Sequence, residues 1–252
     1  ISLISNPPNL RAIRPHMMTL RRAATDPDSV PGMPNDLVSE ELPWKFEYVI
    51  ERIRMASKEG RKIIVWSTFV SHLERLENLL LEFDPAIVYG AISSDPNASL
   101  RGRAKIGSRE WMFDKFKFDA SCSVLLANPA ACGESISLHH WCNEAIYFDR
   151  SYNAAHYLQS KDRIHRYGQH PDTEEHTCRI NQVRYKILIT EDTIDNKIND
   201  RLEDKIAAQN ALLESGQFHI ALEEEGTSDG IQGEQGGGAS NQDVLDFINS
   251  FR

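Results

Sequence analysis

The sequence lacks a membrane-spanning run, a paired cysteine motif and an excess of positive charge. None of its apolar runs approaches the roughly 18 residues that a membrane span needs, and no signal peptide is visible. The cysteines show neither a C-x-x-C pair nor zinc-type spacing; they are Cys122, Cys132, Cys142 and Cys178. These absences argue against a membrane span, a zinc finger and a disulfide scaffold, and they favour buried thiols in a reducing compartment.

Metal binding is also not expected from the histidines. His139 and His140 are adjacent, so on a strand their side chains would face opposite ways and could not share an ion. The sequence therefore predicts no metal site of its own.

The charge balance is acidic. Asp and Glu number 37 against 28 for Lys and Arg, which gives a net charge of −9. This balance argues against a basic footprint spread over the whole surface. Local basic clusters remain, and they are Arg11, Arg14, Arg21 and Arg22, followed by Arg101, Arg103, Lys105 and Arg109.

The composition changes along the chain in a way that predicts four segments. Residues 1–43 carry seven prolines and are expected to be an irregular lead-in with short helical pieces, such as 17–24. A globular unit over 44–190, a long helix over 191–216 and an acidic, Gly-rich flexible tail over 217–252 are expected to follow. The last residues, 241–251, could be a short docking helix or a frayed end. Since the chain begins without Met, we expect that it is cut from something longer.

Short apolar runs alternate with helical patterns in the globular unit. Strands are predicted at 63–66, 86–90, 123–128 and 145–149, with one or two more over 176–189, and helices at 44–58, 71–83 and 108–118. This alternation predicts an α/β fold with a parallel sheet covered by helices on both faces. Ser67, Gly90 and the loops after Asn128 and Asp149 follow strand ends, so they should lie along one edge, where such sheets bind ligands.

The segment from Asn153 to Gln169, NAAHYLQSKDRIHRYGQ, is the most informative part of the chain. It predicts one helix with Asn153 as its N-terminal cap and Gly168 as its stop. Gln159, Asp162, Arg163 and Arg166 fall at i, i+3, i+4 and i+7 and so share one face. Two guanidinium groups on one stripe suit phosphate oxygens, although a solvated polar face gives the same pattern.

The order of segments resembles the C-terminal lobe of Swi/Snf-type superfamily 2 ATPases. IIVWSTFVSHLERLENLL is similar to their fourth helicase motif, and SVLLANPAACGESISLHHWCNEAIYFDRSYNAAHYLQSKDRIHRYGQ is similar to the fifth and sixth run together. LRRAATDPDSV resembles the family's lead-in, and TIDNKINDRLEDK resembles its closing brace helix. The resemblance covers roughly residues 15–212. The residues of the fifth and sixth motifs look more like those of the prokaryotic branches of this family.

This resemblance implies the second RecA-like lobe of a two-lobed, ATP-driven motor. The other lobe would carry the phosphate loop and hold most of the ATP with Mg²⁺; no G-x-x-x-x-G-K-[ST] motif occurs here, so the chain alone should be inactive. The resemblance also implies double-stranded DNA and that N-terminal lobe as partners, in the cytoplasm of a prokaryote or the nucleus of a eukaryote. A non-catalytic interaction module and an RNA-directed helicase lobe are the alternatives.

The same resemblance assigns residues to the ATP site. Arg163 and Arg166 would face the γ-phosphate, with Arg166 as the arginine finger and Gln159 in support. Gly133 and Glu134 would open the fifth motif near ATP, although Ser135 stands where the family has a second glycine. The alternative for the two arginines is an ion pair with Asp162 or Glu174, and for Gly133 an ordinary turn.

Nucleic-acid contacts are implied at the strand ends and loops. The expected residues are Ser67, Thr68, Gly90, Arg101, Arg103, Ser135, Ser137 and Tyr152, of which Tyr152 replaces a more typical tryptophan. Such contacts would bind phosphates without reading bases, as sequence-independent tracking requires. A solvated loop is the alternative for the arginine cluster at 101–103.

Overall fold

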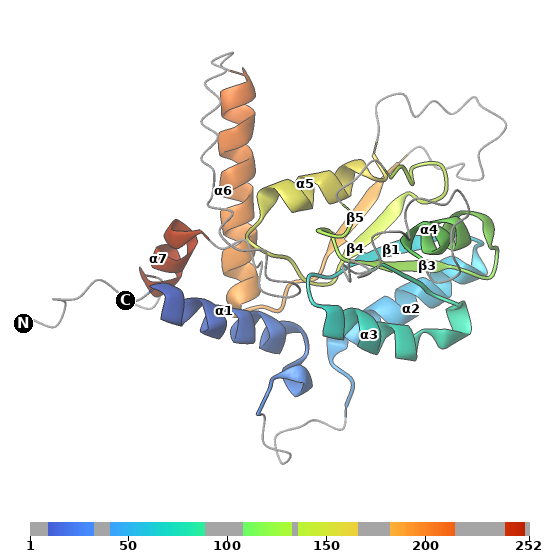
Figure 1. Ribbon diagram of the computed structural model, residues 1–252, viewed down its shortest axis with the longest axis horizontal. Helices are drawn as coiled ribbons and strands as arrows, with labels where there is room; N and C mark the ends of the chain where they lie inside the picture. Colours follow the sequence, from blue (N-terminus) through green and yellow to red (C-terminus); the bar gives the residue numbers. More distant parts are fainter. Residues whose placement is uncertain are drawn as a thin grey trace, which may run out of the picture.

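One parallel sheet forms the centre of the molecule. The computed structural model describes residues 10–32, 41–88, 108–132, 136–165, 182–214 and 240–249. The strands are β1 (Ile63–Trp66), β2 (Ala86–Val88), β3 (Val124–Ala127), β4 (Glu144–Tyr147) and β5 (Arg184–Ile187). Every pairing is parallel, and the order is β2-β3-β1-β4-β5 (Figure 1). The predicted parallel α/β sheet is confirmed.

Alternate residues of the three central strands enter two separate hydrophobic layers. Ile63 and Val65 of β1 pack into one layer, and Ile64 and Trp66 pack into the other. β1, β3 and β4 are buried along their whole length. β1 and β3 therefore appear in the sequence as continuous apolar runs rather than alternating ones, whereas β4 begins with the buried Glu144.

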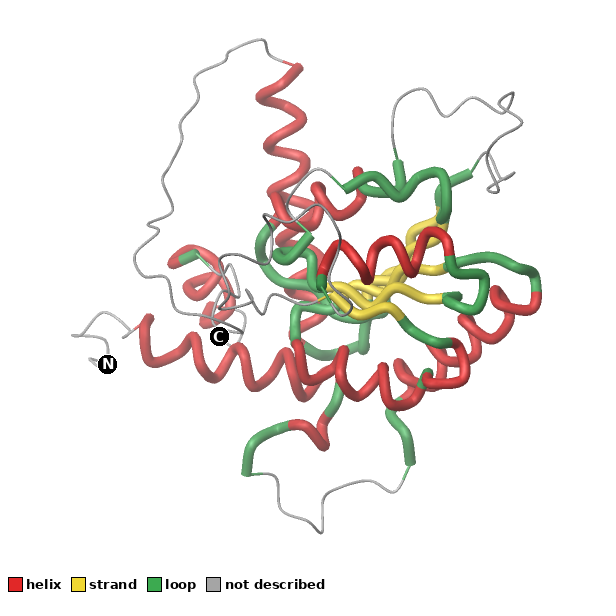
Figure 2. Tube along the Cα trace, turned by 45° about the vertical axis from the view of Figure 1, so that its right-hand side comes forward, coloured by secondary structure: helices red, strands yellow, loops and turns green. Residues whose placement is uncertain are grey.

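Helices cover both faces of the sheet, as predicted. α2 (Trp44–Lys58) and α3 (Val70–Leu79) supply side chains to one layer, and α4 (Arg109–Phe118) and α5 (Ala154–Asp162) supply them to the other. Figure 2 shows helices on both sides of the strands. Short 3-10 turns, η1 (Pro27–Ser29) and η3 (Leu81–Phe83), join some of these elements. α2 is followed by Gly60 at φ +65°, a left-handed backbone conformation that suits a helix end.

A second, smaller cluster lies beside the sheet and is built from three helices distant in sequence. α1 (Leu10–Thr25), α6 (Ile194–Glu214) and α7 (Asn241–Asn249) meet there, and we call them the helical module (Figure 1). The buried side chains of its core are Met17, Tyr152, Ile194, Ile198, Leu202 and Val244. The last helix is therefore packed against α1 and α6, and its role beyond these contacts stays a prediction.

α1 differs from the short pieces expected between prolines. It is one helix of 16 residues with Pro15 inside it. Proline removes a backbone donor and costs about 3 kcal/mol or more in a helix interior. Burial of Met17 against α6 and the hydrogen bond from Thr19 Oγ1 to the Pro15 carbonyl (3.0 Å) support the helix across that position.

Buried polar contacts attach the helical module to the sheet. Lys45 at the start of α2 pairs with Asp195 at the start of α6 (2.6 Å), and its ammonium also donates to Thr25 Oγ1 (3.2 Å). Arg150, after β4, donates to Asn199 Oδ1 of α6 (2.6 Å). The module is therefore held at the end of the sheet where β4 finishes.

Candidate functional site

The sheet reverses its winding direction between β1 and β4, which are neighbours. β1 is followed by α3 on one face and β4 is followed by α5 on the other, so the two connections leave the sheet in opposite directions. Ligands of open parallel sheets bind at such a point, beyond the carboxyl ends of the strands. The loops that begin at Ser67 and Asp149 meet there, and we call this pair of loops the switch-point site.

Asp149 is the centre of the switch-point site. Its carboxylate is buried and accepts hydrogen bonds from the backbone N–H of Thr68 (2.8 Å) and from the hydroxyls of Ser67 and Thr68. His72 Nδ1, from α3, lies 3.1 Å from the same carboxylate. Burial alone would raise the pKa of Asp149, but the contacts with His72, Ser67 and Thr68 hold that pKa well below its usual range. The group is a buried anion that fixes the loop after β1.

Arg21 of α1 joins the two loops from outside the sheet. Its Nη2 donates to Thr68 Oγ1 (2.7 Å) and to the Arg150 carbonyl (3.1 Å). The guanidinium also lies over the Phe69 ring, 5.0 Å from the ring centroid. Burial lowers the pKa of Arg21, and the nearby charges of Asp149, Tyr152 and Asp195 oppose that shift. The switch-point site is therefore charge-balanced by a residue of the lead-in.

Sequence reasoning found part of this arrangement. Ser67 and Thr68 were expected at a strand end, and the structure places them there, with both hydroxyls donating to Asp149. Asp149 was expected only as the end of a strand, and Arg21 only as one of a basic cluster. The signal for Asp149 was available, because an acidic residue just beyond a buried strand of a parallel sheet lies near the edge where such sheets bind ligands.

The predicted arginine helix is shorter than expected. Its cap is confirmed, since the Asn153 side chain accepts from the N–H of His156 (3.0 Å). The helix ends at Asp162, however, and not near Gly168, so the expected extent was wrong. The last turn tightens to i→i−3 bonds, with Ile164 N–H donating to the Lys161 carbonyl (3.2 Å), and Ile164 enters the core.

The described residues of the predicted ATP site are Gln159 and Arg163. Gln159 is exposed on α5. Arg163, the residue directly after α5, is only 9% exposed. Arg163 Nη1 donates to the Ile136 carbonyl (3.4 Å), and the Arg163 carbonyl accepts from Leu138 N–H (2.8 Å). Ser137 lies in the same short stretch. The end of α5 and the loop of the predicted fifth motif are thus brought together.

Several predicted site residues lie outside the described part of the chain. They are Arg166, Gly133 and Glu134 for ATP, and Gly90, Arg101, Arg103 and Ser135 for nucleic acid. Their roles stay predictions.

Tyr152 lies away from the surface where a nucleic-acid contact was expected. It is 2% exposed in the core of the helical module, and its carbonyl accepts from Lys205 Nζ of α6 (3.0 Å). Burial raises the pKa of Tyr152 to about 12. In this arrangement α1, α6 and α7 surround the side chain.

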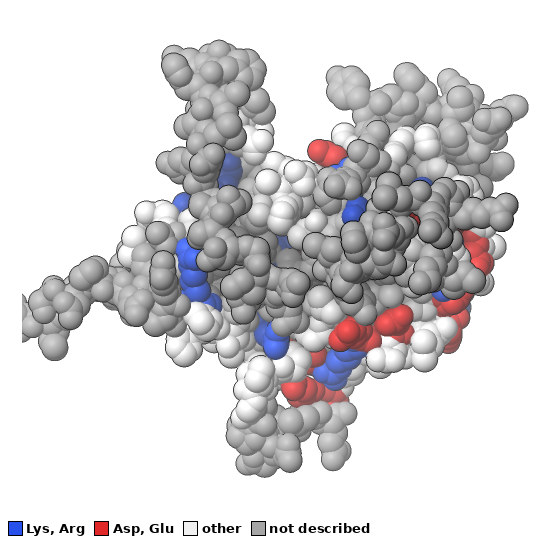
Figure 3. All heavy atoms as spheres, viewed as in Figure 1, with Lys and Arg blue, Asp and Glu red and all other residues white. Residues whose placement is uncertain are grey.

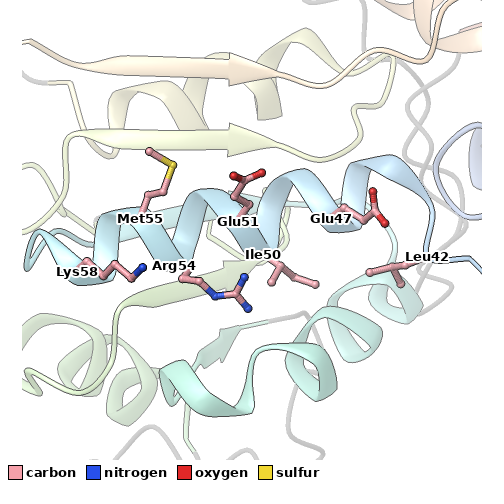
Figure 4. Close-up of a pocket in the computed structure, with 7 residues that line it drawn as sticks. All are labelled: Leu42, Glu47, Ile50, Glu51, Arg54, Met55 and Lys58. Carbon is pink, nitrogen blue, oxygen red and sulfur yellow. The ribbon is translucent and has the colours of Figure 1, made fainter.

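The surface hollow along α2 is separate from the switch-point site. It has a volume of about 560 Å³ and is lined by Leu42, Glu47, Ile50, Glu51, Arg54, Met55 and Lys58 (Figure 4). None of the predicted site residues lines it. Its charged lining and the exposed Met55 are those of an ordinary helix surface.

The described residues contain neither a metal-binding cluster nor a reactive thiol among Cys122, Cys132 and Cys142. No group of three or more His, Cys, Asp or Glu side chains among them could hold a metal ion. Cys122, Cys132 and Cys142 are buried and none of these three forms a disulfide. Burial raises the pKa of Cys132 to about 12, which makes its thiol unreactive near neutral pH.

Comparison with protein families places β1 to β4 and α5 in one matched region, which ends before β5. Residues 44–168 match the family described as "Helicase conserved C-terminal domain". The matched range runs from the start of α2 to the predicted end of the arginine segment. It therefore contains the switch-point site and the described part of the predicted ATP site.

Curated relatives are ATP-dependent helicases that are much longer than this chain. "ATP-dependent helicase FUN30" of Saccharomyces cerevisiae is 27% identical over 200 residues, which is 76% of this chain and 16% of that protein. "ATP-dependent helicase fft2" of Schizosaccharomyces pombe is 26% identical over 206 residues, 80% of this chain and 14% of that protein. These relatives are mostly eukaryotic, with one from Bacillus subtilis, and they do not support the expected prokaryotic branch.

A solved structure of the same kind confirms the RecA-like fold. The "Sulfolobus solfataricus SWI2/SNF2 ATPase C-terminal domain" superposes with a TM-score of 0.54 at 20% identity, over 84% of this chain and 75% of that one. At this identity the likeness concerns the fold. In the described part of this chain, no helix is both long and apolar enough to cross a membrane.

Proposed function

Because residues 44–168 match the helicase conserved C-terminal domain family, we propose that this chain is the C-terminal lobe of a Snf2-type, ATP-dependent motor acting on double-stranded DNA. The observation that carries the proposal is the RecA-like sheet whose switch-point site and α5, with Arg163 directly after it, fall within one matched region. The names of the relatives, which include ATP-dependent helicases, support the use of ATP. The chain covers a small part of those proteins, so their activity is proposed here and not transferred.

In this proposal the segment that begins with α5 and continues to Arg166 completes an ATP site held mainly by another lobe. ATP with Mg²⁺ would bind to an N-terminal lobe, and Arg163 and Arg166 would reach the γ-phosphate when the lobes close. Gln159 is exposed on α5, where it could meet a nucleotide presented from outside this chain. A positioned arginine stabilises the charge of the transferred phosphoryl group and contributes roughly 10³–10⁵ in rate. Gly133 and Glu134 would complete this side.

The switch-point site serves as the link to nucleic acid. Ser67 and Thr68 both donate to Asp149, so we assign them to shaping the loop and presenting it to a backbone phosphate. Arg21 offsets the Asp149 charge, which would otherwise repel a phosphate at this edge. Gly90, Arg101, Arg103, Ser135 and Ser137 would supply further phosphate contacts.

The two sides are connected through the loop after β4. Asp149 fixes the loop after β1, and the chain runs from Asp149 through Arg150 to the cap of α5 at Asn153. A change at the nucleic-acid side therefore has a short covalent path to Arg163. Such a connection suits a motor in which closure on DNA controls hydrolysis.

Substitution of the two arginines tests the catalytic assignment. In the longer protein that includes the first lobe, we expect Arg163→Ala and Arg166→Ala each to lower the DNA-stimulated turnover of ATP by about 10³ or more. ATP binding should be largely retained, because the other lobe would hold most of the nucleotide. Steady-state phosphate release and nucleotide binding are the measurements.

Arg54→Ala is the matched control, because Arg54 is half exposed on α2 and pairs only with Glu82 at the surface among its described ion pairs. Its turnover should equal that of the unchanged protein. Normal turnover in both Arg163→Ala and Arg166→Ala would refute the arginine-finger role and favour a non-catalytic module.

A further inference from the structure

α7 is held on α6 mainly by one buried carboxylate, beside which the exposed Asp246 lies 3.6 Å from Arg201 Nη1. Asp243 accepts from Arg201 Nε (2.7 Å) and Lys205 Nζ (2.9 Å), both of α6, and its side chain is 0% exposed. It also accepts from the backbone N–H and the hydroxyl of Ser240, each at 2.8 Å. Burial alone would raise the pKa of Asp243, but these donors hold it below its usual range.

Asp243 thus has two separate tasks. Ser240 Oγ accepts from Asp243 N–H (3.2 Å) while the Asp243 carboxylate accepts from Ser240, which is the reciprocal pattern of a capping box. The carboxylate is therefore part of the start of α7. It is also the anion that faces two cations spaced one turn apart on α6. Removal of α7 would leave Arg201 and Lys205 without this counter-charge.

Tyr152 lies beneath this contact with its hydroxyl unsatisfied. It shares the module core with Val244 of α7, and its Oη is buried without a hydrogen-bond partner among the described residues. The charges of Arg21 and Asp243 both act on this phenol. A buried hydroxyl without a partner costs about 1–3 kcal/mol. The surface that α7 covers therefore contains a buried donor, the Tyr152 hydroxyl, that makes no hydrogen bond to α7.

A phosphate would accept hydrogen bonds from Arg201 and Lys205 as the Asp243 carboxylate does. Guanidinium and ammonium groups bind carboxylate and phosphate oxygens alike, and a phosphate offers more acceptor oxygens. α7 is short enough to be marginal as an isolated helix, and residues 215–239 separate it from α6. Figure 3 shows basic side chains along α6 and beside α7 on this face.

We infer that Arg201, Lys205 and Tyr152 form a binding site for a phosphate of the nucleic-acid backbone, and that α7 occupies this site in cis through Asp243. The inference rests on the proposed function, because it needs nucleic acid as the ligand. It also accounts for Tyr152, a predicted nucleic-acid contact that the structure finds covered. α7 and the nucleic acid would then compete for one site.

Binding of a labelled DNA duplex of a few helical turns to this chain tests the inference. Fluorescence anisotropy would give Kd at several salt concentrations between about 50 and 200 mM. Asp243→Asn, and a chain ending at residue 239, should bind more tightly than the unchanged chain. Their plots of log Kd against log salt should be steeper by about one to two, since one or two more phosphates are neutralised.

Matched variants separate this site from a general change of charge. Asp114→Asn removes the same charge from the exposed surface of α4 and should leave Kd and slope nearly unchanged. Arg201→Ala with Lys205→Ala in the Asp243→Asn chain should remove the gain. A synthetic peptide of residues 240–252 should displace DNA from the shortened chain, and the same peptide with Asn at 243 should not.

Equal Kd and equal slope for the unchanged, Asp243→Asn and shortened chains would overturn the inference, and α7 would then be a fixed part of the fold. Circular dichroism checks that the variants are folded, and the Asp243→Asn chain keeps the apolar contacts of α7 if the shortened chain is unstable. DNA-stimulated hydrolysis by the longer protein would leave the proposed function standing even in that case.

Discussion

At the scale of single residues, Asp149 shows how a buried charge is kept where the sheet changes direction. Its carboxylate accepts from the Thr68 backbone and from two hydroxyls, with His72 at 3.1 Å. A buried carboxylate with several donors remains ionised because those hydrogen bonds offset its loss of hydration. The residue can therefore hold the loop after β1 in one conformation.

Replacement of Asp149 should lower stability in a pH-dependent way. Asp149→Asn should reduce the free energy of unfolding at neutral pH by about 3 kcal/mol, since the charged acceptor is lost and an amide N–H₂ would meet the Thr68 donor. The pKa of Asp149 is depressed in the fold. Its contribution is therefore present above about pH 3.9, the ordinary value of an aspartate, and is lost as pH falls below it.

Urea unfolding between neutral pH and pH 3 measures this effect. The difference between the unchanged chain and Asp149→Asn should stay constant down to about pH 4 and shrink only below it. Asp114→Asn, an exposed aspartate of α4, should show neither the loss nor its pH dependence. A constant difference at every pH would mean that the charge of Asp149 contributes nothing to folding.

The contacts of Asp149 show what a sequence can and cannot indicate at this scale. A strand end predicts Ser67 and Thr68 at the ligand edge, because strands of a parallel sheet finish together. The partners of Thr68 are Arg21 and Asp149, which lie 47 and 81 positions away in the sequence. No local pattern records such pairs, because they depend on how the lead-in helix packs.

At the scale of elements, local signals decided most of the fold. The apolar run at 63–66 and the cap at Asn153 each mark a boundary that the structure contains. The end of α5 was missed because a tertiary preference prevailed: Ile164 is buried in the core and the chain turns early to place it. α1 continues through Pro15 for a similar reason, since packing against α6 outweighs local propensity.

The Lys45–Asp195 pair joins α2 to α6 and gives a prediction at this scale. Lys45 is 0% exposed, so Asp195→Ala would leave a buried ammonium without its anion. We expect a loss of about 3–5 kcal/mol in the free energy of unfolding, and faster hydrogen exchange along α6. Recovery of part of the loss by Lys45→Met in the same chain would show that the unpaired charge is the cause.

Asp200→Ala provides the control on the same helix, because Asp200 is exposed. It should change neither stability nor exchange by more than a few tenths of a kcal/mol, as surface substitutions usually do. If Asp195→Ala and Asp200→Ala behaved alike, the buried pair would not be what attaches α6 to the sheet.

At the scale of the whole molecule, the sheet and the helical module form a connected unit. Arg21, Arg150 and Lys45 bridge them at the edge where the strands finish. The parallel sheet with helices on both faces was predictable from alternating patterns. The module was not, because its three helices come from both ends of the chain and meet only in the folded state.

ATP hydrolysis by the longer protein, with and without duplex DNA, tests the central claim most directly. This chain alone should release no phosphate above background, since no phosphate loop occurs in its sequence. Joined to its N-terminal lobe, it should support hydrolysis that duplex DNA accelerates by at least an order of magnitude. Hydrolysis that is equally fast with and without DNA, or absent from the longer protein, would contradict the account.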